Sequence, residues 1–182
     1  MICNGIDTDR LAAFGGFVAE HPDAATLSTR VATRWDESYR TEAGTAAFEF
    51  AGGAIPRTTS MSSDLPRVLG GDDAGPTPGE LVLAALGSCV AQAFVESAAM
   101  AGIAIDHLEV AAEGHLDLRG IVGFVGVRPG FTRIHLDVQV ASSADAAQID
   151  QLVAAALQRS PVADTVRSGV QIDASVRQPD PA

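Results

Sequence analysis

The segment GGDDAGPTPGELVLAALGSCVAQAFVESAAMAG, residues 70–102, determines how the rest of the chain folds. Thr77, Pro78 and Glu80 mark a helix start. Thr77 can accept from the amide three residues on, Glu80 can reach back, and proline is tolerated at the first helical position. From residue 81 to 95 nearly every position is apolar or small. We expect a central core helix, since its apolar run is shorter than the roughly 20 residues that cross a bilayer.

The composition limits the classes of function that the chain can have. Its 182 residues carry a formal net charge of -11, and the twelve basic residues are all arginines, without a basic run. This argues against a nucleic-acid partner, because such binding depends on cationic contacts to phosphates. Two cysteines without a CxxC motif, Cys3 and Cys89, fit a reducing cytoplasmic compartment. The scattered histidines have no ligand spacing and predict no metal site.

The N-terminal residues 1–26 predict a helical extension, followed by the main domain over residues 27–178. A short amphipathic helix is expected from about residue 8 to 20, capped by Asp7 and stopped by His21-Pro22. Acidic residues precede its apolar stretch, where a signal peptide would need basic ones. We expect this helix to lie on the main domain.

The remaining pattern predicts an α+β fold with mainly antiparallel sheets around the long helix. Residues 55–69 are ambiguous, with an edge strand as one reading, and the glycine-rich residues 119–130 form a loop. A helix follows from Ser143 or Asp145 to about Arg159. Strands are expected over residues 26–35, 45–50, 103–118, 131–141 and 170–176.

A homodimer is expected from the central helix itself. The helix has so little polar surface that a single chain of this size could hardly bury all of its apolar surface. Small residues recur along one side and would let a second helix come close: Ala84, Gly87, Ser88 and Ala91. Burial against a second copy is the simplest arrangement.

The segment from Gly75 to Cys89, GPTPGELVLAALGSC, resembles the reactive-cysteine helix of the OsmC/Ohr family, the osmotically induced and organic hydroperoxide resistance proteins. The late segment Ser160-Pro161-Val162 resembles the second motif of that family, and the element order matches over residues 27–177. The resemblance implies an intertwined α+β homodimer. It also implies a thiol peroxidase that reduces organic hydroperoxides through Cys89, without a cofactor beyond an external thiol reductant.

The chain departs from the family pattern at Ser160. The peroxidases of the family carry a second cysteine at this position, which closes a disulfide with the first. A serine hydroxyl cannot form that disulfide, so the two-cysteine cycle is unavailable here. Cys3, far away in sequence near the terminus, is a poor substitute.

The resemblance also implies that an arginine paired to Glu80 activates Cys89. Arg40 is the first candidate, followed by Arg67 and then Arg34. Glu80 and Cys89 are nine positions apart, roughly 13 Å, on opposite sides of the helix. If both serve one site, an arginine must bridge them or the partner chain must contribute one.

Gln92, one turn beyond Cys89, and Ser160 are expected to line a binding pocket. Three hypotheses follow from these residues. In the first, the chain is a one-cysteine peroxidase that acts on small apolar hydroperoxides. In the second, it is a non-catalytic dimer that binds small molecules. Neither hypothesis includes a nucleic-acid or membrane partner. In the third, Cys89 only packs in a structural dimer. The family resemblance favours the first hypothesis, whereas Ser160, in place of the second cysteine, favours the second.

Overall fold

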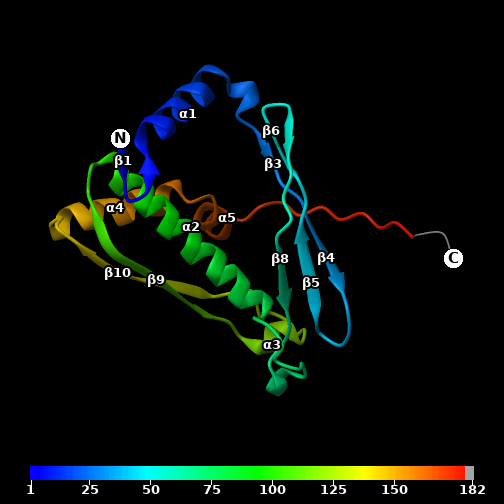
Figure 1. Cartoon of the computed structure of the whole chain (residues 1–182). Coiled ribbons are helices and arrows are strands. Elements are labelled where there is room, and N and C mark those ends of the chain that lie inside the picture. Colours follow the sequence, from blue (N-terminus) through cyan, green and yellow to red (C-terminus); the bar gives the residue numbers. More distant parts are fainter. Residues whose placement is uncertain (179–182) are drawn as a thin grey trace.

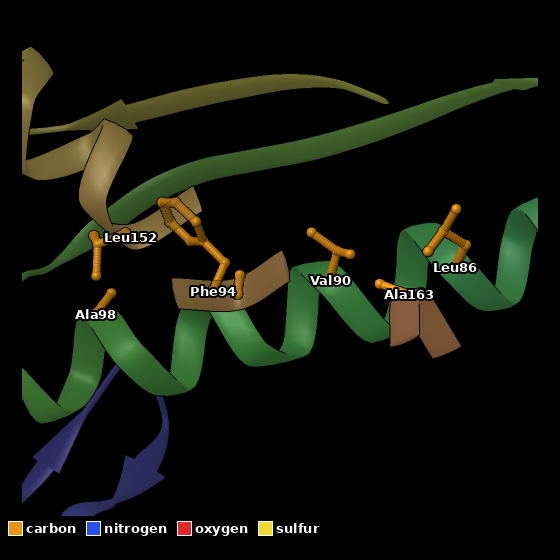
Figure 2. Packing of buried hydrophobic residues seen from close by; sticks show 7 residues of the cluster. Leu86, Val90, Phe94, Ala98, Leu152 and Ala163 are labelled. Carbon is orange, nitrogen blue, oxygen red and sulfur yellow. The ribbon is translucent and has the colours of Figure 1, made fainter. Parts of the chain in front are cut away.

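The computed structural model describes residues 1–178 and is organised around one long helix, α2 (Pro78–Met100). The predicted capping box is present: Glu80 accepts from the Thr77 amide at 2.7 Å, and Thr77 Oγ1 accepts from the Glu80 amide at 3.2 Å. The buried residues of α2 follow one stripe. Figure 2 shows Leu86, Val90 and Phe94 along that side of the helix, with Leu152 and Ala163 beside them.

Strands β9 (Ile105–His115) and β10 (Arg133–Ser142) form a long antiparallel hairpin against α2 (Figure 1). Their residues alternate between half-buried and exposed, with Val110 opposite Val138, as the sequence pattern predicted. The short helix α3 (Leu118–Ile121) lies at the tip of the hairpin, where the predicted strand was expected to end and the predicted loop to begin. The apolar sides of both strands complete the core over α2.

Helices α4 (Ala146–Arg159) and α5 (Pro161–Ser168) pack beside α2. Asp145 begins α4 with a capping box, which decides between the two caps that the sequence allowed. Helix α5 was not predicted; Ser160 caps it, and Pro161 occupies its first position. Because the core reaches from α2 to both helices, all three depend on one another for burial.

The N-terminal residues form a small hairpin, β1 (Ile2–Cys3) with β2 (Ile6–Asp7), before helix α1 (Thr8–Glu20). Asn4 fixes the hairpin to the segment after α2, donating to Ile103 O at 2.9 Å and accepting from Ile105 N at 3.0 Å. Helix α1 is capped by Asp7 as predicted, and a 3₁₀ helix, η1 (Pro22–Ala24), follows it.

Two small antiparallel sheets follow α1, with strand orders β3-β6-β7 and β4-β5-β8. Phe50 of β6 lies 5.9 Å from the ring of Phe14 on α1. The second sheet extends away from the α2 body (Figure 1), and every residue of β4 is exposed. The strands are β3 (Leu27–Ser28), β4 (Val31–Trp35), β5 (Thr41–Thr45), β6 (Phe48–Phe50), β7 (Gly53–Ile55) and β8 (Ser60–Ser63).

Several predictions of strands were wrong. The expected strand over residues 45–50 is the end of β5 and the whole of β6, which belong to different sheets. The ambiguous residues 55–69 contain β8 and a 3₁₀ helix, η2 (Arg67–Leu69). Residues 170–176 form no strand, although they are extended in Figure 1, because none of the strands in residues 1–178 pairs with them.

Two expectations about α2 also need correction. It is the one helix in residues 1–178 that is long and apolar enough to cross a membrane, so its length does not identify it as a core helix, although one stripe of it packs in the core. Gly87 does not face a free surface, since a Cβ there would lie 3.2 Å from Val110 O of β9. Ala84 and Ser88 are exposed, and only 28% of the most apolar window of α2 is buried.

Candidate functional site

Cys89 lies near the middle of α2 at the edge of its buried stripe. Its neighbours Leu86 and Val90 are buried, Ala85 and Gln92 are exposed, and Cys89 itself is half-buried. A thiol of this accessibility can meet a small molecule while its backbone stays fixed by the core helix. The helix thus supplies a rigid position for one reactive group.

Glu80 serves the start of α2 and does not contact Cys89. Its carboxylate accepts hydrogen bonds from the amide and hydroxyl of Thr77, at 2.7 and 2.9 Å. These bonds hold the pKa of Glu80 below its ordinary value, the backbone bond contributing most. Because the two residues lie on opposite sides of one helix, a shared site within the protomer would need a bridging group.

The N-terminal sheet brings two of the candidate arginines together. Arg34 and Arg40 line a hollow of about 600 Å³ between β4, β5 and β8, together with Trp35 and Met61. Arg40 donates to Asp36 at 2.9 Å and lies 3.5 Å from Glu37, and the Asp36 hydrogen bond raises the pKa of Arg40 further. The hollow is formed without any residue of α2.

The other three candidate residues, Arg67, Gln92 and Ser160, lie in three different surroundings. Arg67 begins the exposed 3₁₀ helix η2 and is not part of the hollow that holds Arg34 and Arg40. Gln92 is exposed. Ser160 is 1% exposed, and its Oγ accepts from Ala163 N at 3.1 Å as the cap of α5, so the hydroxyl has a structural partner.

The sequence did not single out Asp64, which organises the loop before α2. This carboxylate is 1% exposed and accepts from the amides of Leu65, Asp72 and Ala74, at 2.8, 3.1 and 3.1 Å. The bond from Ala74 is the main reason why the pKa of Asp64 is lowered, and Arg40 adds to the effect. The signal in the sequence that could have identified Asp64 is its position eight residues before Asp72 and ten before Ala74, in the Asp-Asp-Ala turn.

Arg159 is a second residue that the sequence did not single out. It closes an ion pair with Glu96, on the α2 face that carries Cys89, and also approaches Ser97 Oγ at 3.5 Å. The side chain of Glu96 is partly covered by this contact. Within residues 1–178, no group of three histidine, cysteine or acidic side chains is placed to hold a metal ion.

A family model for OsmC-like proteins matches residues 70–175, which include α2, β9, β10, α4 and α5. The chain belongs to the OsmC-like family. The match covers both segments on which the resemblance was based, the Cys89 helix and the Ser160-Pro161-Val162 motif. No curated protein matches the sequence.

Solved structures show the OsmC-like fold at low sequence identity. A protein of Psychrobacter arcticus described as osmotic-stress-induced and related to detoxification is 16% identical (TM-score 0.60; 76% of this chain, 88% of that one). An OsmC-like protein of unknown function from Vibrio cholerae is 19% identical (0.58; 77% and 94%). The organic hydroperoxide resistance protein OsmC of Legionella pneumophila is 18% identical (0.51; 77% and 89%). The α+β architecture predicted from the sequence is thereby confirmed.

Proposed function

We propose that this OsmC-like chain is a one-cysteine thiol peroxidase that reduces organic hydroperoxides through Cys89. The observation that supports it is the half-buried thiol in the middle of α2, within the segment that matches the family model. One structural neighbour, the Legionella pneumophila protein, is named for organic hydroperoxide resistance. A small apolar hydroperoxide suits a thiol one helical turn from an apolar, exposed residue such as Ala85.

The proposed cycle needs only one protein sulfur. The Cys89 thiolate attacks the outer oxygen of the hydroperoxide, the O–O bond breaks, and the alkoxide takes up a proton and leaves as the alcohol. Cys89 is then a sulfenic acid. One external thiol displaces water to form a mixed disulfide, and a second releases Cys89 as a free thiol with an external disulfide as product. This reductant places the proposed activity in a reducing, cytoplasmic compartment.

The proposed active form is a homodimer whose sites combine two chains. Within one protomer, Cys89 lies on α2 while Arg34 and Arg40 line a hollow on the separate N-terminal sheet. The exposed β4 strand and the largely unburied α2 both leave apolar surface for a second copy. A guanidinium from the partner would favour the thiolate of Cys89.

Mixing two inactive variants tests the shared site. Neither Cys89→Ser nor Arg40→Ala homodimers should consume cumene hydroperoxide with dithiothreitol at a wild-type rate. A mixed dimer holds one site with an intact Cys89 and an intact Arg40 if these come from different chains, so mixing after unfolding and refolding should restore activity. Activity that stays absent in the mixture, with mixed dimers detected by native mass spectrometry, would contradict a site shared between chains. Full activity of Cys89→Ser would contradict the peroxidase.

The alternative is a dimer that binds small molecules without turnover. The buried Ser160, committed to the α5 cap, favours it, because the chain lacks the second sulfur of the family's peroxidases. The two proposals differ in one measurement. A binding module should leave both the hydroperoxide concentration and the mass of the protein unchanged.

A further inference from the structure

Three arginine side chains line one small hollow beside the β9–β10 hairpin. Arg128 and Arg133 flank the entry into β10, and Arg167 lies in the last turn of α5. The hollow has a volume of about 280 Å³ and no acidic residue in its lining. Its other lining residues are Phe131, Thr132, Ile134 and Val166.

None of these guanidinium groups has a carboxylate partner among the described residues. In residues 1–178, the arginine ion pairs are those of Arg40, Arg119 and Arg159. Arg167 is held in place by a hydrogen bond from its Nη2 to Leu157 O at 3.2 Å, which leaves its other N–H donors free. Three like charges around one hollow repel one another, and an anion bound between them would relieve this repulsion.

An apolar hollow of about 400 Å³ adjoins the arginines. It shares Ile134, Val166 and Arg167 with the first hollow, so the two hollows lie side by side, and we call the pair the depression. The rest of its lining is mainly aliphatic: Leu86, Leu136, Leu157 and Ala163, with His135 at one side. Together the two hollows offer positive charge at one end and hydrocarbon contacts at the other.

We propose that this depression binds an amphiphilic anion, with a carboxylate or phosphate head on Arg128, Arg133 and Arg167 and an aliphatic chain in the apolar hollow. Guanidinium groups match the oxygens of both head groups in paired hydrogen bonds. The apolar hollow gains free energy from covering an aliphatic chain. Cys89 lines neither hollow, so this site does not depend on the proposed peroxidase.

Titration calorimetry on the full chain tests the site with four ligands. Octyl phosphate and octanoate carry the two candidate heads, octanol lacks a charge, and inorganic phosphate lacks the chain. At least one of the two anionic amphiphiles should bind with one molecule per chain. The amphiphile with the higher affinity identifies the preferred head group. Binding of octanol or of inorganic phosphate as tight as that of both amphiphiles would overturn the proposal, because charge or chain would then contribute nothing.

Variants assign the binding to these arginines. Arg128→Ala combined with Arg133→Ala, and separately Arg167→Ala, should weaken the preferred amphiphile about tenfold or more, since each removes hydrogen bonds to a charged group. Arg10→Ala on the exposed α1 is the matched control for the loss of one positive charge and should bind like the wild type. Unchanged affinity in both arginine variants would overturn the site.

Val166→Glu provides a second, independent variant. Val166 is 40% exposed, so the new carboxylate can be accommodated without disturbing the core, and it would pair with the arginines and exclude an anion. Thermal unfolding should confirm a folded protein, and the preferred amphiphile should bind at least tenfold more weakly. Cys89→Ser should retain full binding, which separates this inference from the peroxidase. Wild-type affinity in a folded Val166→Glu variant would contradict it.

Discussion

Arg159 and Glu96 join the last turn of α4 to the α2 face that carries Cys89. Glu96 is seven residues beyond Cys89, or roughly 10 Å along the helix, so this ion pair supports the helix without touching the thiol. Both side chains keep substantial contact with water, at 54% and 31% exposure. The pair therefore contributes little net free energy.

A double-mutant cycle should measure this small contribution. We expect a coupling of less than about 1 kcal/mol between Arg159→Ala and Glu96→Ala in urea unfolding at low salt, decreasing further as salt is added. The rate of Cys89 alkylation should change less than twofold in either variant. A coupling well above 1 kcal/mol that resists salt would mean that the pair is shielded from water.

Local rules in the sequence predicted the elements that organise the core. The Thr77–Glu80 capping box and the alternation of β9 and β10 depend on neighbouring residues alone, and both were confirmed. The 3₁₀ helix η2 and strand β8 lie in the segment that the sequence left ambiguous. A proline-bracketed segment rich in serine and threonine has no period that could decide between them.

The missed features depend on contacts that are distant in sequence. Residues 170–176 alternate as a strand should, yet a strand needs a neighbour to accept its hydrogen bonds, which this part of the chain does not find in the described protomer. Gly87 fits an interface pattern, but the approach of the Val110 carbonyl explains it. The Ser160-Pro161 pair, which resembles a family motif, is also a strong helix start.

The role of each candidate site residue stays a prediction. The sequence singled out Cys89 by its resemblance to a family motif, and the structure gives its place, half-buried on α2. Which arginine serves it stays a prediction, because Arg34 and Arg40 lie in a hollow without α2 residues. The sequence of one chain does not reveal which of its surfaces meet in an assembly.

Asp64 should make the stability of the protein depend on pH. Its three amide hydrogen bonds lower the pKa of the folded carboxylate below its unfolded value near 4. The stabilisation is therefore complete above that value and is lost as the pH falls through the folded pKa. Asp64→Asn should lower the melting temperature at pH 7, and this difference should shrink towards pH 3. A difference that is the same at both pH values would contradict the role of the charge.

Gly71 and Gly16 should respond to alanine in opposite directions. A Cβ on Gly71 would lie 2.0 Å from Leu65 O, so Gly71→Ala must distort the Asp64 loop and should cost about 1–3 kcal/mol. Gly16 lies inside α1 with nothing within 4 Å of the new Cβ, so Gly16→Ala should stabilise the chain by up to about 1 kcal/mol. Urea unfolding of both variants measures the two effects. A stable Gly71→Ala variant would show that the loop can rearrange.

Ser160 should be important for stability through its cap. Its buried Oγ accepts the Ala163 amide at 3.1 Å, and losing this bond leaves a buried donor without a partner. Ser160→Ala should therefore lower the free energy of unfolding by about 1–2 kcal/mol, whereas Ser168→Ala, at the exposed end of α5, should change it little. An equal effect of the two substitutions would mean that the cap does not stabilise α5.

Oxidation of the wild-type chain should stop at one oxygen atom on Cys89. No sulfur stands at position 160, and Cys3 lies at the far end of α2, where its Sγ is 3.6 Å from Ile103 O. The end of the helix at Met100 is roughly 16 Å beyond Cys89, whereas a disulfide needs Cα atoms within about 4.4–6.8 Å. Intact mass after one equivalent of cumene hydroperoxide should show a gain of one oxygen, removed by a small thiol, and excess oxidant should add a second irreversibly.

Ser160→Cys should change this outcome if the two positions approach one another. A disulfide with Cys89 would appear as a loss of two hydrogen masses after oxidation, and the variant should resist formation of the sulfinic acid. Cys3→Ser is the matched control and should oxidise like the wild type, because the terminal thiol takes no part in the proposed cycle. A loss of two mass units in the wild type that disappears in Cys3→Ser would overturn the one-cysteine cycle. No mass change at any oxidant concentration would favour the binding module, because a thiol that a hydroperoxide cannot oxidise cannot reduce one.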